Sequence, residues 1–289
     1  MQACLIVLLT AASLPLTPKG EPAVLDPSAV AVFADLREEG LELETLVRDL
    51  PDAAWAGPTP APGWTVAHQI AHLHWTDRAA LVSLTDPEGF ALMVEEAVKS
   101  PGSFVDEGAA QGAALPPAEL LDRWRAGRAA LDAALAAASP DAKFPWYGPP
   151  MKAASMASAR LMETWAHGQD VADALAVRRT PTGRLRHVAR IGVRARDYAF
   201  AVRGLPAPAG EFRVELVPPD GGEPWVYGPP DAADRITGPA LDFCLLVTQR
   251  AHRADLAVTA TGPEADRWLD IAQAFAGPAG PGRAPGATR

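Results

Sequence analysis

The sequence contains few cysteines, few lysines and no long uninterrupted run of apolar residues. Only two of its 289 residues are cysteines, Cys4 and Cys244, and they lie far apart, which excludes a disulfide framework and a cysteine-ligated zinc site. Four lysines accompany twenty-two arginines, and the net charge is −9, so the basic surface of a nucleic-acid-binding protein is not expected. No apolar run reaches the roughly 20 residues of a membrane-spanning helix, so we expect no stable membrane anchor.

The remaining composition is that of an ordinary globular protein. Apolar residues make up 48% and charged residues 21% of the chain, which is long enough for one large or two ordinary domains. The stretch "ACLIVLLTAASLP" has the length of a signal-peptide core, but no Lys or Arg precedes it. We therefore expect residues 1–25 to be an extension, disordered or signal-like. A loose extension or a start site assigned too early is favoured over export.

Helical spacing of apolar residues dominates the first part of the chain. Pro27 and Pro117 are good first residues of helices, and Thr65 is a good N-cap. We predict helices over 27–50, 65–84, 87–99, 117–138 and 152–177. The stretch 100–116 is interrupted by Gly and Pro, so we expect a loop there. Four long helices joined by loops predict a four-helix bundle over residues 26–178.

The pattern changes after "RRTPTGR" at 178–184. We predict a helix over 185–202, strands in "EFRVELV", "EPWVYG" and "ADLAVTATG", and helices in "GPALDFCLLVTQ" and "PEADRWLDIAQAF". This order predicts a small α+β domain over residues 184–277, in which Cys244 is a buried, inert thiol. The Pro- and Gly-rich end predicts a disordered tail over 278–289.

The candidate chemistry lies in "ETWAHGQD" and "AHQIAHLHW". Glu163 and His167 are four residues apart, so on a helix their side chains share a face. His68 and His72 share a face in the same way, and His74 points elsewhere. One of these histidines on a facing helix would complete a set of two histidines and a glutamate, the pattern of a catalytic rather than a structural zinc site. The alternative is that the Glu163 pair is an ordinary surface contact.

Other polar and aromatic residues have two interpretations each. Asp170 either holds a metal ligand by a hydrogen bond or is an exposed helix acid. Trp64 and Trp165 are expected to pack in the core rather than to face a substrate.

Three arginines form a stripe at the start of the second part, because Arg186, Arg190 and Arg194 are spaced four apart. Such a stripe either grips carboxylates of a thiol cofactor or substrate, with Arg190 at its centre, or forms salt bridges on a solvated face.

Two segments resemble a known family. "PGWTVAHQIAHLHWTDRAAL" and "ARLMETWAHGQDVADAL" resemble the DinB-like helical bundles, and more narrowly the N-terminal domain of the mycothiol-dependent maleylpyruvate isomerase family. In that family a His after the "GWT" turn and an ExxxH pair bind a divalent metal. The resemblance places these roles on His72, Glu163 and His167, with His72 favoured over His68 by the "AHL" match.

The resemblance covers roughly residues 30–278 and implies a function. "ITGPALDFCLLVTQR" with "VTATGPEADRWL" is similar to the family's second, sterol-carrier-like domain. The family implies a cytoplasmic protein with a divalent metal, most suitably zinc, that activates mycothiol to attack a small electrophile, by isomerisation or S-transfer. The alternative is a non-catalytic, metal-stabilised module that binds an apolar ligand or a partner protein. The segment before the ExxxH pair is typical of a subgroup whose substrate the resemblance does not give.

Overall fold

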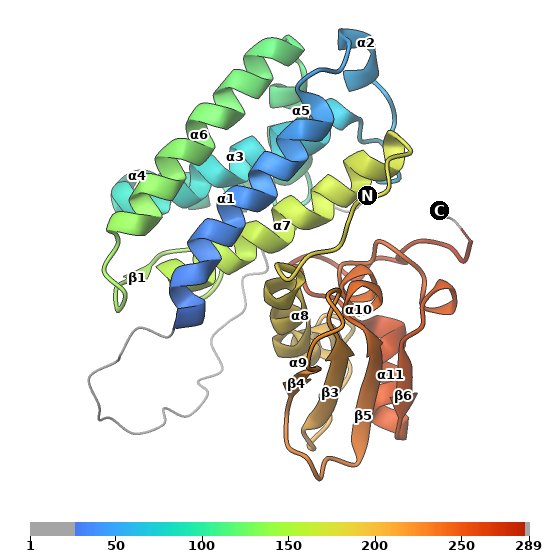
Figure 1. The fold of residues 1–289 in the computed structure, drawn as a ribbon. Coiled ribbons are helices and arrows are strands. Elements are labelled where there is room, and N and C mark those ends of the chain that lie inside the picture. Colours follow the sequence, from blue (N-terminus) through green and yellow to red (C-terminus); the bar gives the residue numbers. More distant parts are fainter. Residues whose placement is uncertain (1–26, 287–289) are drawn as a thin grey trace.

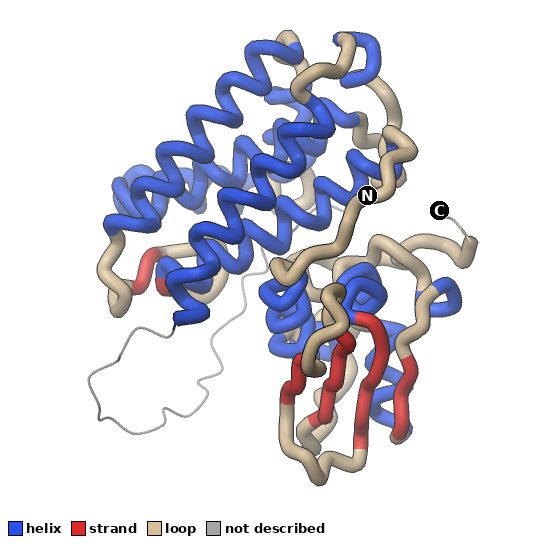
Figure 2. Tube along the Cα trace, in the orientation of Figure 1, coloured by secondary structure: helices blue, strands red, loops and turns tan. Residues whose placement is uncertain are grey.

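Helices occupy the first part of the chain, and the larger sheet forms only after residue 210 (Figure 1, Figure 2). The structure is a computed structural model and describes residues 27–286, so the extension expected over 1–25 lies outside the described residues. The elements of the first part are α1 (Pro27–Val47), α2 (Asp52–Trp55), α3 (Val66–Thr85), α4 (Pro87–Lys99), α5 (Phe104–Ala113), α6 (Pro117–Ala137), β1 (Lys143–Phe144), β2 (Met151–Lys152) and α7 (Ala153–Ala174).

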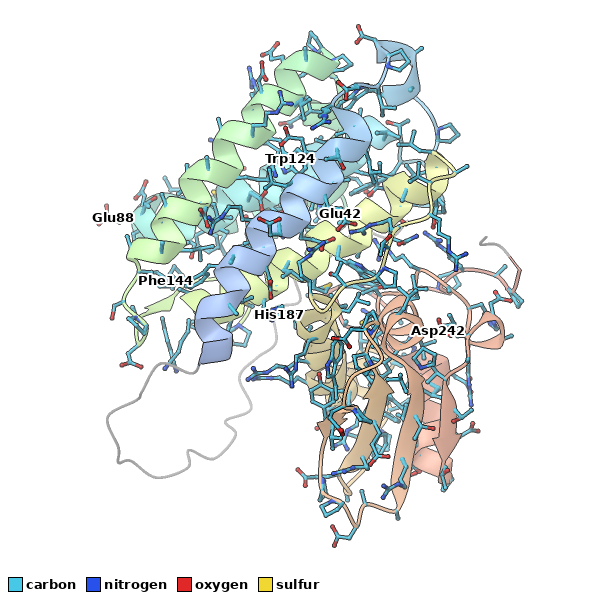
Figure 3. The ribbon with its side chains drawn as sticks, viewed as in Figure 1. Glu42, Glu88, Trp124, Phe144, His187 and Asp242 are labelled. Atoms are coloured by element: carbon cyan, nitrogen blue, oxygen red, sulfur yellow. The ribbon has the colours of Figure 1, made fainter. Side chains whose placement is uncertain are left out.

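The four long helices α1, α3, α6 and α7 contact one another in the first part of the chain. Helix α3 contacts α6 and α7, and α1 contacts α7 and α6. Their apolar faces meet in a core that includes the fully buried side chains of Leu43, Ile70, Leu120 and Trp124 (Figure 3). The hydroxyl of Thr65 caps the start of α3, as predicted. No described helix is both long and apolar enough to cross a membrane.

The loop expected over 100–116 is wrong, because helix α5 forms there against α3. A Cβ atom on Gly112 would lie 2.7 Å from the Cβ atom of Ala71, and one on Gly108 would lie 3.1 Å from the ring of Trp75. These glycines therefore permit a close approach of two helices rather than marking a loop. The sequence pattern alone does not separate these two uses of glycine.

The second part contains α8 (Leu185–Arg194), α9 (Arg196–Ala201), β3 (Phe212–Val217), β4 (Trp225–Tyr227), β5 (Asp234–Pro239), α10 (Ala240–Val247), the 3-10 turn η1 (Arg253–Asp255), β6 (Thr259–Thr261) and α11 (Pro263–Ile271). The strand order is β4-β3-β5-β6, with β3 and β5 parallel and the outer pairs antiparallel. Strand β5 was not predicted, and the helix expected over 185–202 breaks at Ala195. The last helix is shorter than predicted, because Ala272 has extended backbone angles.

Helices α10 and α11 cover one face of this sheet (Figure 1). Alternate residues of β3 face them, and the ring of Phe212 packs against Trp268, which also contacts Phe243. Cys244 is fully buried in α10, as predicted, and burial raises the pKa of its thiol well above the ordinary range. The fold is thus mostly helical with a small mixed sheet.

Ion pairs join the two parts beside α1. His187 on α8 lies 2.7 Å from the Asp35 carboxylate, and Arg184 donates from Nε to Glu39 at 2.7 Å (Figure 3). Arg184 also binds Glu42. Because Glu39 is almost fully buried, these contacts act in a less screened setting than surface pairs.

The end of the chain also returns to the helical part. Residues 278–286 form neither helix nor strand, but Arg283 donates to Asp170 at 2.5 Å and to Asp173 at 2.7 Å, both on α7. The disordered tail expected over 278–289 is therefore wrong for 278–286, because an arginine with charged partners fixes this segment.

The close approach of α5 and α3 can be tested at Gly112. Gly112→Ala improves helix propensity by up to about 1 kcal/mol, yet we expect it to destabilise the protein by about 1 kcal/mol overall, because overpacking costs more. The measurement is the free energy of unfolding in urea. The control is Gly102→Ala, since an added Cβ there meets nothing within 4 Å. A more stable Gly112→Ala variant would contradict the packing account.

Candidate metal centre

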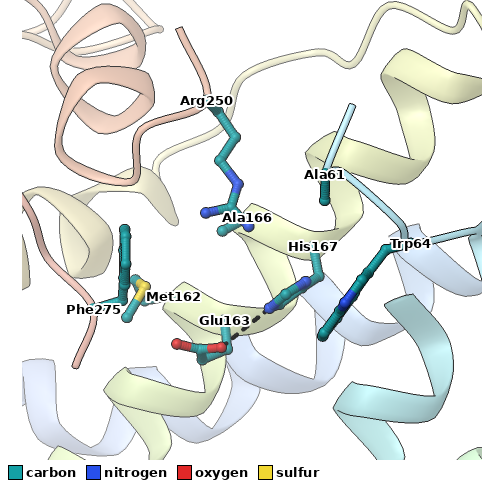
Figure 4. A pocket seen from close by; sticks show the side chains of 8 residues that line it. All are labelled: Ala61, Trp64, Met162, Glu163, Ala166, His167, Arg250 and Phe275. Carbon is teal, nitrogen blue, oxygen red and sulfur yellow. Dashed lines mark hydrogen bonds and ion pairs between the residues drawn. The ribbon is translucent and has the colours of Figure 1, made fainter. Parts of the chain in front are cut away.

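Three buried side chains converge from two facing helices. His72 comes from α3, and Glu163 and His167 come from adjacent turns of α7. One Glu163 oxygen lies 3.4 Å from Nε2 of His72. The same oxygen lies 3.2 Å from Nε2 of His167 (Figure 4). One potential ligand atom from each residue lies within 4.8 Å of the others. The sequence expectation that these three residues meet agrees with this geometry.

The surroundings hold these groups in protonation states that suit a metal ligand. Burial alone would raise the pKa of Glu163, but its contacts with His167 and His72 outweigh burial and hold the pKa well below its ordinary value. Burial and repulsion from His167 lower the pKa of His72 to about 4. At neutral pH the site therefore offers a carboxylate and a neutral His72 imidazole, as metal binding requires.

A chain of hydrogen bonds fixes the tautomer of His167. The hydroxyl of Thr59 donates to the carbonyl of Trp64 at 2.9 Å, so it accepts from the amide nitrogen of Gln69 at 2.9 Å. The Gln69 oxygen then remains to accept from Nδ1 of His167 at 2.5 Å. This assignment follows from the network, since hydrogens are not observed.

A cation between His167 and Glu163 would suit this network. If His167 is neutral, its one N–H is the one directed to Gln69. The lone pair on Nε2 would then face the Glu163 carboxylate at 3.2 Å, and two acceptors would oppose each other. A metal ion between them would remove the repulsion, and the hydrogen bond at the other ring nitrogen is the usual support for a metal-binding histidine. The residues present thus fit a divalent metal.

A buried ion pair holds α3 and α7 together beside the three residues. Arg160 donates from Nε to Asp77 at 2.9 Å and from Nη2 to the hydroxyl of Thr76 at 2.6 Å. Thr76 in turn donates to the backbone carbonyl of His72 at 2.8 Å. Because all these groups are buried and paired, they fix the position of His72 along the α3 axis relative to α7.

A pocket opens onto the candidate ligands at the junction of the two parts (Figure 4). It is lined by Ala61, Trp64, Met162, Glu163, Ala166, His167, Arg250 and Phe275. Arg250 and Phe275 come from the second part of the chain. The sequence analysis did not single them out, because they are more than 80 residues from the ligand pair and local spacing does not show which distant segments pack together.

His68 is not part of this group among the described residues. Its Nδ1 atom lies 2.8 Å from the hydroxyl of Thr65 in the capping box of α3. Arg190 is exposed on α8, as are Arg186 and Arg194, and none of them lines the pocket. A role of His68 or Arg190 next to the metal therefore has no support in this geometry.

Both interpretations of Asp170 are wrong. The residue is only 2% exposed, so it is not a surface acid. Its carboxylate accepts from Arg250 at 2.9 Å and from Arg283 at 2.5 Å, and within the described residues it has no hydrogen bond to His72, Glu163 or His167. Asp170 connects α7 to the second part of the chain instead.

Trp64 has a larger role than the packing expected of it. Its ring stacks on His167 with centroids 5.8 Å apart and an interplanar angle of 18°, and it lines the pocket. Its indole N–H donates to Asp106 of α5 at 3.0 Å, so the unpredicted helix helps to orient it. Trp165 is buried in the core, as predicted.

His68 and His72, two of the three histidines of α3, provide a matched test of the metal centre. We expect protein purified without chelator to hold about one divalent metal per chain, and His72→Ala to lose it, because three protein ligands become two. His68→Ala should keep the metal and lose only part of a helix cap, about 1 kcal/mol of stability. The measurement is elemental analysis combined with thermal melting. Metal loss in His68→Ala but not in His72→Ala would contradict the assignment.

Comparisons with known proteins identify two matching family models and two similar sequences. Residues 36–172 match the family model described as mycothiol maleylpyruvate isomerase N-terminal domain, and residues 208–261 match one described as wyosine base formation. Uncharacterised proteins from two strains of Mycobacterium tuberculosis are each 58% identical over 250 residues, which cover 86% of this chain and 97% of the relative.

Solved structures show the same fold. The mycothiol-dependent maleylpyruvate isomerase matches with a TM-score of 0.54 at 20% identity, and a histidine-to-alanine mutant of it matches with 0.55 at 19%. Each match covers 82% of this chain and 95% of the other. The chain belongs to the family that carries the mycothiol maleylpyruvate isomerase N-terminal domain.

Proposed function

We propose that the protein binds a divalent metal through His72, Glu163 and His167 and uses it in a mycothiol-dependent reaction with a small electrophile, by isomerisation or S-transfer. Zinc is the metal proposed, because two imidazoles and one carboxylate suit it well. The observation that carries the proposal is the pocket that opens onto Glu163 and His167, since a catalytic site needs access for a further ligand.

The metal would supply one kind of chemistry here, which is to lower the pKa of a coordinated thiol so that it is a thiolate at neutral pH. The residues of the chain prepare the site for this. Glu163 is the only anionic residue among the three candidate ligands, so it would limit the net positive charge of the site with a metal ion bound. Gln69 keeps the lone pair of His167 directed at the site. Trp64 and Phe275 line the pocket with apolar surface that can keep water away from a reactive thiolate.

The activity of the structurally similar mycothiol-dependent maleylpyruvate isomerase supports mycothiol as the thiol. We propose that this chain uses the same thiol. We also propose the cytoplasm as its location, because low-molecular-weight thiols are kept reduced there. We also propose that the helical part is a DinB-like four-helix bundle and that the second part is a sterol-carrier-like domain.

The alternative is a non-catalytic module in which the metal is structural. That function would be favoured by a closed shell of four protein ligands, for example with both His68 and His72 engaged. The capping contact of His68 and the open pocket weigh against it.

Glu163→Gln separates the two functions. We expect weaker metal binding and near-complete loss of thiol-dependent turnover, because an amide replaces the only anionic ligand. The fold should persist, since glutamine has similar volume and helix propensity. The measurement is turnover of a panel of electrophiles with mycothiol, alongside melting curves with and without zinc. If Glu163→Gln unfolds the protein while the wild type reacts with no electrophile, the metal is structural and the alternative holds.

A further inference from the structure

The pocket beside the candidate ligands is too small for a thiol as it stands. Its free volume is about 20 Å³, and one water molecule needs roughly 10–15 Å³ of such volume. A thiol that reaches a metal at Glu163 and His167 brings at least one carbon with its sulfur. Part of the pocket wall must therefore move before a thiol enters. The wall comes from α7, from the loop that holds Trp64 and from the second part of the chain.

Most of this wall is tied to helices. Helix α7 supplies two of the ligands and contacts α1, α3 and α8. The indole of Trp64 donates to Asp106 of α5 at 3.0 Å, and its backbone carbonyl accepts from the N–H of Thr59 at 2.8 Å. The buried Arg250 donates to Asp170 of α7 at 2.9 Å. Movement at any of these places would break contacts that hold helices in position.

Phe275 lies in a segment of a different kind. Residues 275–286, here called the strap, follow the last helix and form neither helix nor strand. Phe275 and Trp64 lie on opposite sides of Glu163 and His167 (Figure 4). From residue 278 onward every described residue of the strap is at least partly exposed. The strap can therefore swing outward, and carry Phe275 with it, without opening the core.

The start of the strap has its own attachments to the second part of the chain. The N–H of Ala274 donates to the carbonyl of Val247 at 2.7 Å, so the residue before the strap is held in place. The hydroxyl of Tyr198 on α9 accepts from the N–H of Gly277 at 3.0 Å and donates to the Gly277 carbonyl at 3.0 Å. These neutral hydrogen bonds place the pivot of the strap close to Phe275.

The far end of the strap is held by charge. Arg283 donates to Asp170 at 2.5 Å and to Asp173 at 2.7 Å, and its side chain is only 9% exposed. Both aspartates belong to α7, the helix that carries Glu163 and His167. Charge-assisted hydrogen bonds are roughly twice as strong as neutral ones. Arg283 is thus the strongest attachment between the strap and the helix that it covers.

We propose that the strap is a lid over the candidate metal centre, held closed by Arg283, and that Phe275 is the side chain that closes the pocket. The inference rests on the proposed function and adds control of access to the same site. The closed pocket admits water. When Arg283 leaves Asp170 and Asp173, Phe275 withdraws and a thiol reaches the metal. Because a thiol enters only the open state, its rate of entry follows the fraction of protein that is open.

The entry of a thiol can be timed when cobalt(II) replaces zinc, because a cobalt-bound thiolate gives a charge-transfer absorption band. Stopped-flow mixing of the cobalt-loaded full chain with 2-mercaptoethanol measures the growth of this band. Arg283→Gln should speed it roughly tenfold, because the loss of charged hydrogen bonds raises the open fraction by about that factor. The control is Arg213→Gln, which removes an arginine that donates to Glu215 at 2.8 Å on the sheet. It should leave the rate within about twofold, since Arg213 is not part of the pocket wall.

A double variant distinguishes a lid from a general loss of structure. Phe275→Ala should also speed entry roughly tenfold, since the pocket then stays open whether or not the strap is closed. Adding Arg283→Gln to Phe275→Ala should change the rate less than about twofold further, because two changes that act through one closing side chain are not additive. If Arg283 only stabilised the fold, the two effects would multiply.

The outcomes separate the lid from the proposed function. A chain that binds no cobalt(II) overturns the proposed function, and the lid with it. The same holds if Phe275→Ala gives no charge-transfer band at saturating 2-mercaptoethanol. A band whose rate of growth is unchanged in Arg283→Gln overturns only the lid. Equal acceleration by Arg213→Gln, or effects of Phe275→Ala and Arg283→Gln that multiply, also overturn only the lid.

Discussion

The structure around the pocket depends on one buried carboxylate. Glu163 lies between two imidazoles at a depth where an uncompensated charge would be strongly destabilising. The negative charge of Glu163 is offset only if His72 of α3 lies level with it. His167 must lie one turn further along α7. The Gln69 chain and the Arg160 ion pair fix those positions from either side. Much of the α3–α7 interface therefore serves to place three ligand atoms.

The second part of the chain completes the pocket rather than standing apart from it. Arg250 and Phe275 supply part of the pocket wall, and Asp170 ties α7 to Arg250. The candidate ligands all come from the helical part, whereas groups that could recognise a substrate come from both. In this arrangement, changes in the second part would alter the pocket wall without disturbing the candidate ligands.

Local signals in the sequence were enough for the four long helices of the first part and for the ligand pair. The i, i+4 spacing of Glu163 and His167 is a property of any helix, and the N-cap at Thr65 fixes which residues of α3 face inward. Features that arise from packing between distant segments could not be predicted in this way. Helix α5, in which Gly108 and Gly112 are four residues apart, depends on its contact with α3. The role of Asp170 depends on Arg250 and Arg283, which are 80 and 113 residues away.

The same limit applies to the pocket. Trp64 directly precedes the N-cap of α3, and its stacking on His167 of α7 has no signature in the sequence. The resemblance to a known family supplied the choice of His72 over His68, which spacing alone left open, since both lie on the same face of α3. Geometry then gives the physical reason, because His68 is used in the helix cap.

The central claim is that a metal held by His72, Glu163 and His167 keeps a position open for a thiol. X-ray absorption at the zinc edge of the loaded protein tests this most directly. The account predicts a shell of nitrogen and oxygen only, which gains one sulfur scatterer at about 2.3 Å when mycothiol is added. A shell that already contains a third histidine, or one that gains no sulfur at saturating mycothiol, would contradict it.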